Sequence, residues 1–288
     1  MRVAIYGLSK TGTTALYSKL KAAMSPEPAS YFEPAPHHLA RLRRQQWLAR
    51  IGIGRSHPLL VKFLPFQPGA EAMLNRFGSF DRSILLTRDP RDRLVSDILY
   101  RAYDSPIARD DAQILRYLEL LAAKQRDPRA VSLLELRASV HGPGFSEQDW
   151  RADYAARSIA RPLAFADAHP ELFQFRYEDL VAQEFDALSA YLGIALAGQA
   201  IVAVDLSRVA RTCGAGDWRN WFTAADVAAL RPLLEPYLDR YYPDADWTIA
   251  ADPRIDARYG SDYVRRIVAE RRAMLHLPPL PAPSAQAQ

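Results

Sequence analysis

The chain has 288 residues, of which 49% are hydrophobic and 24% are charged. This balance is typical of a globular protein with a substantial buried core, so it excludes a wholly disordered chain. The 37 basic and 33 acidic residues leave a formal net charge of +4. So small an excess supports anionic ligands only weakly and does not require a nucleic-acid partner.

Cysteine content and the hydropathy of the chain bear on its compartment. Cys213 is the single cysteine, so an internal disulfide is impossible, which fits a reducing compartment. Residues 1–6 lead directly into a glycine turn and lack the pattern of a signal peptide. No stretch approaches the roughly 20 apolar residues that span a bilayer. We therefore expect a soluble, cytoplasmic protein.

The first third of the chain alternates between strand and helix patterns. Strands are predicted at residues 2–6, 59–64 and 83–87, followed by helices that begin at Thr14, extend to Phe77 and span 91–103. Because strands separated by helices form parallel sheets, the pattern favours a three-layer α/β fold. Its central parallel β-sheet would be flanked by helices.

The rest of the chain returns to the sheet after a helical stretch. Residues 110–169 are mostly helical in pattern, with a break predicted at 141–144, and we interpret about 105–170 as a helical insertion. A strand at 172–176, a helix at 178–192 and a helix at 224–241 capped by Thr223 follow. We expect a single domain over 1–277 and a disordered Pro- and Ala-rich tail over 278–288.

A glycine-rich loop stands between the first predicted strand and helix. It reads Gly7-Leu8-Ser9-Lys10-Thr11-Gly12-Thr13-Thr14. Its glycines let backbone N–H groups surround an anion at the helix N-terminus, which predicts a P-loop-like nucleotide site. In the P-loop GxxxxGK[ST] a lysine follows the second glycine, whereas here Thr13 takes that place and the lysine is residue 10. This displacement disfavours triphosphate chemistry.

A second phosphate-binding pattern lies in the segment TRDPRDRLVS. Arg88 is at a strand end, and Ser96 follows in the second turn of the next predicted helix. A guanidinium and a hydroxyl at these positions suit a terminal phosphomonoester. Taken alone, the segment fits equally well a capped surface helix with Arg and Asp pairs.

These segments resemble the motifs of PAPS-dependent sulfotransferases. The segment KTGTT is similar to the family's K-x-G-T-T phosphosulfate motif, which implies that the loop binds the 5′-phosphate and that Lys10 assists sulfuryl departure. The residues so implied are Ser9, Lys10, Thr11, Gly12, Thr13 and Thr14. The Arg88 and Ser96 segment resembles a second signature of the family, which implies that both residues bind the 3′-phosphate of PAPS.

Two later segments extend the resemblance. Residues 211–220 are similar to the family's R-K-G-x-x-G-D-W-K-N loop, although Thr212 and Cys213 replace its lysine and glycine. The resemblance implies that Arg211 binds the 3′-phosphate and that a turn closes over the nucleotide. The residues of this turn are Gly214, Gly216, Asp217 and Trp218. The segment RYEDL implies that Tyr177 contacts the adenine, while Ala15 stands where many cytosolic members have a stacking tryptophan.

Glu33 is the preferred candidate for the general base. Its segment YFEP resembles an element of carbohydrate sulfotransferases, whereas Phe63 stands where phenol and steroid members have a histidine base. His37 and His38 are rival bases, because histidine titrates near neutrality. Lys62 ends the second predicted strand and is a candidate for contacting the transferred sulfonate, with a structural ion pair as the alternative.

The resemblance implies transfer of a sulfonate from PAPS to an acceptor hydroxyl, with PAP as product and no metal. The context of Glu33 favours a saccharide or glycolipid acceptor, while small metabolites and peptide tyrosines stay open as acceptors, and no nucleic-acid partner is expected. One alternative is a P-loop kinase using ATP and magnesium, which would need a lysine after Gly12. Another is a non-catalytic module that binds PAPS or PAP. The sequence indicates no oligomeric state.

Overall fold

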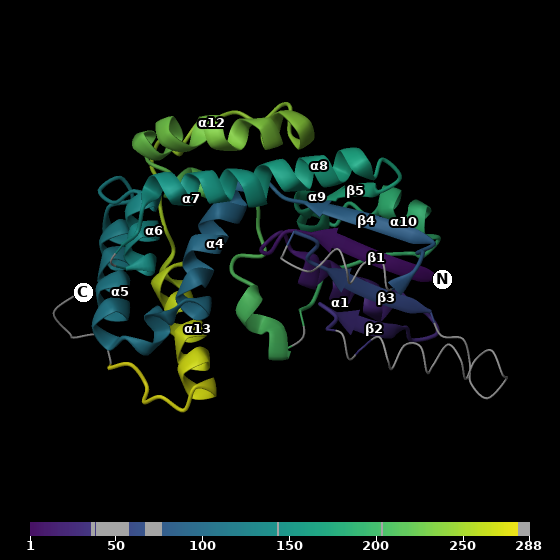
Figure 1. The fold of residues 1–288 in the computed structure, drawn as a ribbon, viewed down its shortest axis with the longest axis horizontal. Helices are drawn as coiled ribbons and strands as arrows, with labels where there is room; N and C mark the ends of the chain where they lie inside the picture. Colours follow the sequence, from purple (N-terminus) through teal and green to yellow (C-terminus); the bar gives the residue numbers. More distant parts are fainter. Residues whose placement is uncertain (36–37, 39–57, 67–76, 143, 203, 282–288) are drawn as a thin grey trace. The chain divides into compact units, whose positions relative to one another are not determined.

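The computed structural model describes residues 1–35, 38, 58–66, 77–142, 144–202 and 204–281 (Figure 1). The chain divides into two compact units. The sheet unit comprises Met1–Asp89 and Asp153–Ala215, and the helical unit comprises Pro90–Ala152 and Gly216–Gln288. The single domain over 1–277 stays a prediction. Of the predicted tail, residues 278–281 have no regular secondary structure and residues 282–288 lie outside the described residues.

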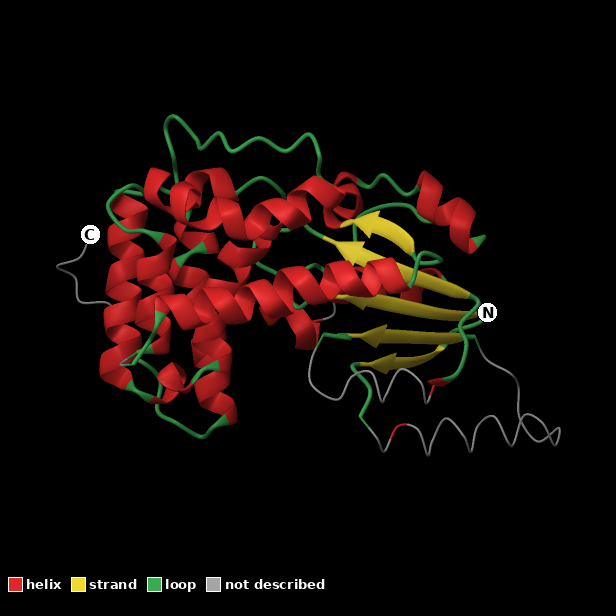
Figure 2. Cartoon of the chain, turned by 45° about the horizontal axis from the view of Figure 1, so that its top comes forward, coloured by secondary structure: helices red, strands yellow, loops and turns green. Residues whose placement is uncertain are grey.

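A five-stranded parallel sheet forms the centre of the sheet unit, in the order β2-β3-β1-β4-β5. The strands are β1 (Arg2–Gly7), β2 (Ala29–Phe32), β3 (Leu59–Phe63), β4 (Arg82–Thr87) and β5 (Phe173–Arg176). In Figure 2 the five arrows point the same way. The predicted strands at 2–6, 59–64, 83–87 and 172–176 are therefore confirmed as β1, β3, β4 and β5.

Helices cover both faces of this sheet. They are α1 (Thr13–Ala23), α8 (Arg161–Ala168), α9 (Tyr177–Ala182) and α10 (Asp186–Leu192). On one face, apolar residues of α1, α9 and α10 form a single buried cluster with β1 residues Val3 and Ile5. On the other face, Tyr6 stacks on Phe63 and its ring centre lies 5.6 Å from that of Phe165 in α8. The predicted three-layer α/β fold with a central parallel sheet is confirmed.

Two elements of the sheet unit differ from the predictions. β2 was not predicted, because it is a four-residue edge strand, ASYF, that pairs with β3 alone. The single helix predicted over 178–192 is wrong, since α9 ends before Gln183, whose φ of 64° is left-handed, and α10 starts afresh at Asp186. Most of the helix predicted to reach Phe77 lies outside the described residues.

The other regular elements are mostly helices of the helical unit. They are α4 (Pro90–Asp104), α5 (Asp111–Arg126), α6 (Leu133–His141), α7 (Glu147–Tyr154), α11 (Trp218–Trp221), α12 (Ala224–Tyr241) and α13 (Ser261–Met274). Short 3₁₀ or π turns lie at Pro106–Arg109, Ala155–Ala160, Val204–Val209 and Ala257–Tyr259. α4 packs against α6, α11, α12 and α13. The predicted cap of Thr223 is confirmed, because its hydroxyl accepts the Asp226 N–H in a reciprocal capping box.

A lysine is buried in the helical unit. Lys124 in α5 is 0% exposed, and its Nζ donates to the carbonyls of Pro128 at 2.9 Å and Val131 at 2.5 Å. Burial lowers the pKa of Lys124 from 10.5 to about 8, although nearby carboxylates, Asp226 foremost, act in the opposite direction. The ammonium is therefore held at a cost in solvation that carbonyl dipoles offset only in part.

Lys124→Met should change the pH dependence of stability. Between the folded pKa of about 8 and the ordinary value of 10.5, the unfolded chain holds the Lys124 proton while the folded chain has released it. Because the unfolded state then binds more protons, linkage raises the wild-type free energy of unfolding as pH rises through this window. We expect the wild type to gain stability over the variant there, measured by denaturant titration.

Lys21→Met is the matched control, because the Lys21 side chain is 44% exposed and pairs with surface Glu27 at 3.8 Å. Its pH profile should follow that of the wild type. A Lys124→Met profile that also runs parallel to the wild type would show that Lys124 does not titrate in this window.

Candidate functional site

The glycine-rich loop joins the central strand β1 to α1. Lys10 and Gly12 both take left-handed conformations, with φ of 66° and 90°. Thr11 is fully buried, and its hydroxyl donates to the Leu8 carbonyl at 2.7 Å. Gly12 is the N-cap of α1, and a glycine has no side chain to cap the helix. The first turn of α1 thus presents backbone N–H groups and the positive end of the helix dipole beside the loop.

Glycine is required at both ends of this turn. A Cβ at Gly7 would lie 2.7 Å from Cγ2 of Thr13, and a Cβ at Gly12 would lie 2.3 Å from Cδ2 of Tyr177. Contacts this short are far inside van der Waals separation. The loop therefore packs so closely that its backbone path leaves no room for side chains at these two positions.

Arg88 lies directly after β4 and is only 6% exposed. Its Nη1 donates to the Lys10 carbonyl at 3.0 Å, and its Cζ lies 4.2 Å from the centre of the Tyr177 ring. Its Nε is buried and makes no hydrogen bond within the described part of the chain. A bound anion would accept a hydrogen bond from this buried donor and offset the buried charge of the guanidinium.

Tyr177 begins α9 and is 8% exposed. Its ring lies against the backbone of Gly12 and beside the guanidinium of Arg88. The ring therefore contacts both groups. The predicted contact of Tyr177 with adenine stays a prediction.

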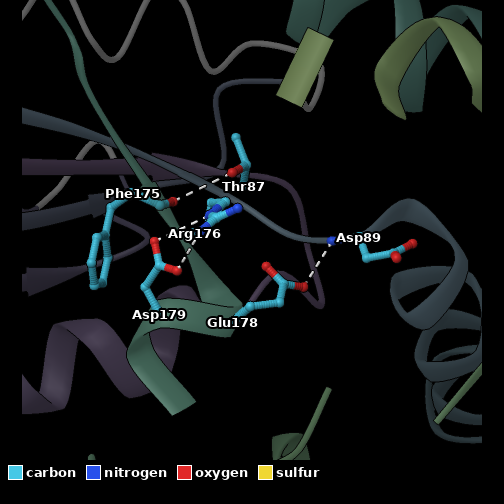
Figure 3. Close-up of polar contacts among 6 residues, drawn as sticks. All are labelled: Thr87, Asp89, Phe175, Arg176, Glu178 and Asp179. Atoms are coloured by element: carbon cyan, nitrogen blue, oxygen red, sulfur yellow. Dashed lines mark hydrogen bonds and ion pairs between the residues drawn. The ribbon is translucent and has the colours of Figure 1, made fainter. Parts of the chain in front are cut away.

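Polar contacts join the end of β4 and the residues after it to β5 and the start of α9 (Figure 3). Thr87 donates to the Phe175 carbonyl at 3.4 Å, and the Glu178 carboxylate accepts the Asp89 N–H at 3.0 Å. The supporting role of Glu178 was not predicted. The signal for it was its place in the first turn of a helix, where a carboxylate is favoured near backbone N–H groups.

Glu33, Lys62 and Thr14 are brought together at the carboxyl edge of the sheet. The Lys62 Nζ donates to Oε1 of Glu33 at 2.5 Å and to Oγ1 of Thr14 at 3.2 Å. Glu33 has a left-handed φ of 46°, and its N–H donates to the Lys62 carbonyl at 3.0 Å. The side chain of Lys62 is 3% exposed and that of Glu33 is 41% exposed. The carboxylate thus reaches solvent while its partner is enclosed.

The buried ammonium of Lys62 is stabilised from several sides. Burial lowers the pKa of Lys62, while the charge and hydrogen bond of Glu33 oppose this effect. Nζ also lies 3.8 Å from the centre of the Phe32 ring, which attracts a cation. Lys62 therefore forms the ion pair that the sequence left as one alternative, and its contact with the transferred sulfonate stays a prediction.

The rival histidines are placed differently. Nδ1 of His38 accepts the Ala35 N–H at 2.9 Å, and the His38 ring packs edge-on against Tyr31. His37 lies outside the described residues. The Ala35 contact therefore occupies Nδ1 of His38, and the role of either histidine as base stays a prediction.

The loop at residues 211–220, called the late loop below, follows the Val204–Val209 turn. Lys10 Nζ donates to the Val209 carbonyl at 3.2 Å, within the sheet unit. The Thr212 hydroxyl accepts the Gly214 N–H at 3.2 Å, which closes a small turn around exposed Cys213, whose φ of 51° is left-handed. Thr212 therefore shapes the backbone at the position where the resembled motif has a lysine. Arg211 is half-buried in the same unit.

The remaining predicted residues belong to the helical unit. Ser96 in α4 is 2% exposed, and Trp218 at the start of α11 is 1% exposed. The N–H groups of Gly216 and Trp218 donate to the buried carboxylate of Asp92, and Asp217 accepts from the Trp221 indole at 3.1 Å. Sequence reasoning missed Asp92. The convergence of Arg88 with Ser96 stays a prediction.

Two further findings concern ligands and membranes. Among the described residues, no group of three or more His, Cys, Asp and Glu side chains could hold a metal ion. None of the helices in the described ranges is long and apolar enough to cross a membrane.

Comparisons with known proteins returned one kind of match. No protein-family model matches the chain, and no curated protein matches it. Among solved structures, the chain is similar to mouse sulfotransferase SULT7A1 complexed with PAP. The identity is 12% and the TM-score 0.48, over 85% of this chain and 86% of that chain. At so low an identity and TM-score, we base the proposed function on this chain's own residues.

Gly12→Ala should destabilise the protein more than an ordinary glycine substitution at positive φ. The new methyl group would meet the Tyr177 ring in addition to straining the backbone. We expect a loss of about 3 kcal/mol or more in the free energy of unfolding, measured by urea denaturation.

Gly193→Ala is the matched control, because Gly193 has a φ of 67° but an added Cβ would meet no heavy atom within 4 Å. It should cost about 1–2 kcal/mol, from backbone strain alone. Equal losses in the two variants would mean that Tyr177 yields without cost and that the loop is not tightly packed.

Proposed function

We propose that the protein transfers a sulfonate from PAPS to an acceptor hydroxyl and releases PAP. The observation that carries this proposal is the placement of Arg88. Its charge is buried against the Lys10 carbonyl, beside the uncapped N-terminus of α1, and its Nε has no hydrogen bond within the described residues. Helix N–H groups and a guanidinium converging on one loop suit a phosphorylated ligand.

The loop residues hold the 5′-phosphate in this proposal. The amides of residues 9–14 and the hydroxyls of Thr13 and Thr14 surround it, and Lys10 neutralises the charge that develops on it as the sulfonate leaves. Lys10 would exchange its contact with the Val209 carbonyl for the phosphate. Arg88, Ser96 and Arg211 bind the 3′-phosphate, a proposal that depends on the sequence resemblance.

Glu33 is the general base in this proposal. The acceptor oxygen forms a bond to sulfur as the bond between sulfur and the 5′-phosphate oxygen breaks, and Glu33 takes the acceptor proton. Lys62 supports this role, because its ammonium pairs with the carboxylate at 2.5 Å and orients it. The exposed side of Glu33 faces solvent, where an acceptor can approach. We propose a saccharide or glycolipid as that acceptor.

Calorimetric titration with PAP tests the donor without knowledge of the acceptor. We expect the wild type to bind PAP more tightly than adenosine 5′-phosphate, which lacks the 3′-phosphate, and more tightly than ATP with magnesium. Arg88→Ala should weaken PAP binding by about tenfold or more, since it removes a charged donor.

Arg176→Ala is the control for Arg88→Ala. The Arg176 side chain is 50% exposed in the same unit and pairs with Asp179 at 2.9 Å. It should leave PAP binding unchanged. A preference for ATP with magnesium would overturn the proposed donor and favour the kinase. Tight PAP binding without any transfer would favour the non-catalytic module.

Glu33→Gln should abolish transfer while sparing the donor. We expect the transfer rate from labelled PAPS, measured with an acceptor identified in a saccharide screen, to fall by about a hundredfold or more. The dissociation constant for PAP should stay within about twofold. The folded fraction must be measured as well, because the variant leaves the Lys62 ammonium buried without its partner carboxylate.

The control is Glu27→Gln, whose side chain is 79% exposed and lies 3.8 Å from Lys21. It should transfer at the wild-type rate. Full activity of Glu33→Gln would move the role of base to His37 or His38.

A further inference from the structure

The first turn of α4 binds the late loop through two adjacent residues of the helical unit. We propose that Asp92 and Arg91 are positioning residues for donor binding, which hold the turn at Gly216 and Trp218 in the shape that the nucleotide requires. This inference rests on the proposed function, because it assigns these residues to the recognition of PAPS. Neither residue was among the candidate site residues that the sequence predicted.

Asp92 holds the backbone of the turn. It is 0% exposed, and its two carboxylate oxygens accept one N–H each, from Gly216 at 2.6 Å and from Trp218 at 2.8 Å. Gly216 has a left-handed φ of 81°. Because hydrogen bonds to an ionised acceptor are stronger and shorter than neutral ones, a buried carboxylate fixes the spacing of these two amides.

Arg91 holds the side chain of Trp218. It is 2% exposed, and its Cζ lies 4.0 Å from the centre of the Trp218 indole and 5.0 Å from that of Trp247. Its Nη1 donates to the carbonyl of Asp246. The guanidinium is therefore enclosed between two aromatic rings and a carbonyl, which favours a single orientation of Trp218.

Ser96 connects this arrangement to the donor. Ser96 lies on the same helix as Asp92 and is 2% exposed, and all the residues of this argument belong to one compact unit. The carboxylate of Asp92 therefore fixes the turn at Gly216 and Trp218 relative to the Ser96 hydroxyl. In the proposed function these two segments serve the same nucleotide, so their relative position sets its affinity.

A purely structural carboxylate in the same unit provides the comparison. Asp226 is also 0% exposed and accepts backbone N–H groups, from Leu133 at 2.9 Å and from Thr223 at 2.9 Å. It joins the start of α6 to the start of α12, and these partners are not among the residues predicted to bind PAPS. Asp92 and Asp226 thus match in burial and chemistry and differ in what they hold.

The test compares Asp92→Asn with Asp226→Asn. In each variant an NH₂ group replaces one carboxylate oxygen and opposes a backbone N–H, so both should lower the midpoint of thermal unfolding. We expect Asp92→Asn to raise the dissociation constant for PAP by about tenfold or more, and Asp226→Asn to leave it within about twofold. Both constants are measured by calorimetry on the folded protein.

Arg91→Lys with Arg272→Lys repeats the comparison should Asp92→Asn fail to fold. Arg272 is also 2% exposed in the helical unit and donates to the Ala108 carbonyl at 3.0 Å. Lysine keeps the charge but loses the planar group that lies against Trp218. We expect PAP binding to weaken by about threefold or more in Arg91→Lys and to be unchanged in Arg272→Lys.

The outcomes separate this inference from the proposed function. PAP binding by the wild type, with equal affinities in the Asp92 and Asp226 variants, would overturn the positioning role and leave the proposed function standing. The same affinity in wild type and Arg91→Lys would do so as well. No PAP binding by the wild type would overturn the proposed function and this inference with it.

Discussion

Close packing of the glycine turn against Tyr177 is the constraint on which the candidate site depends. Because Gly12 lies directly against the ring, the loop has one path from β1 into α1. That path sends the Lys10 carbonyl toward the guanidinium of Arg88, at 3.0 Å. The turn, the Tyr177 ring and the Arg88 guanidinium are therefore in mutual contact, so a substitution at one of them disturbs the packing of the other two.

The parallel sheet brings the remaining groups to the same place. β1 leads into the glycine turn, and Glu33, Lys62, Arg88 and Tyr177 stand at or directly after the ends of β2, β3, β4 and β5. Parallel strands end at one edge, where open α/β sheets bind their ligands. Two of these groups are cations that are almost fully buried, which is costly unless carbonyls, carboxylates, rings or a ligand compensate.

The reach of the sequence can be judged from particular residues. Short apolar runs, LLV in β3 and ILL in β4, identified these strands, because a strand covered on both faces needs a continuous hydrophobic pattern. β2 was not predicted, because an edge strand of four residues carries no such run. The break between α9 and α10 at Gln183 was not predicted, because a glutamine takes the left-handed conformation there, while the usual signal for a helix end is a glycine. The pairing of Lys62 with Glu33 could be suspected from the strand ends, but its geometry could not.

Long-range partners were beyond the sequence patterns for a different reason. A carboxylate in the first turn of a helix is adequately explained by the helix dipole, so Asp92 carried no further signal. Its partners Gly216 and Trp218 lie far along the chain, and only the fold shows that they meet. The same holds for Thr212, whose hydroxyl closes a turn at the position where the sulfotransferase motif has a lysine.

The order of strands in the sheet also separates the residues proposed to act on the acceptor from those proposed to bind the donor. Adjacent strands lie about 4.8 Å apart, so each strand end takes a separate position along the carboxyl edge of the sheet. Glu33 stands at the border strand β2, while the glycine turn and Arg88 follow the inner strands β1 and β4. With the proposed roles, the acceptor chemistry sits at the margin of the sheet and the donor chemistry at its middle. Evolution could then exchange the substrate to be modified by altering the margin, without touching the machinery that holds the nucleotide.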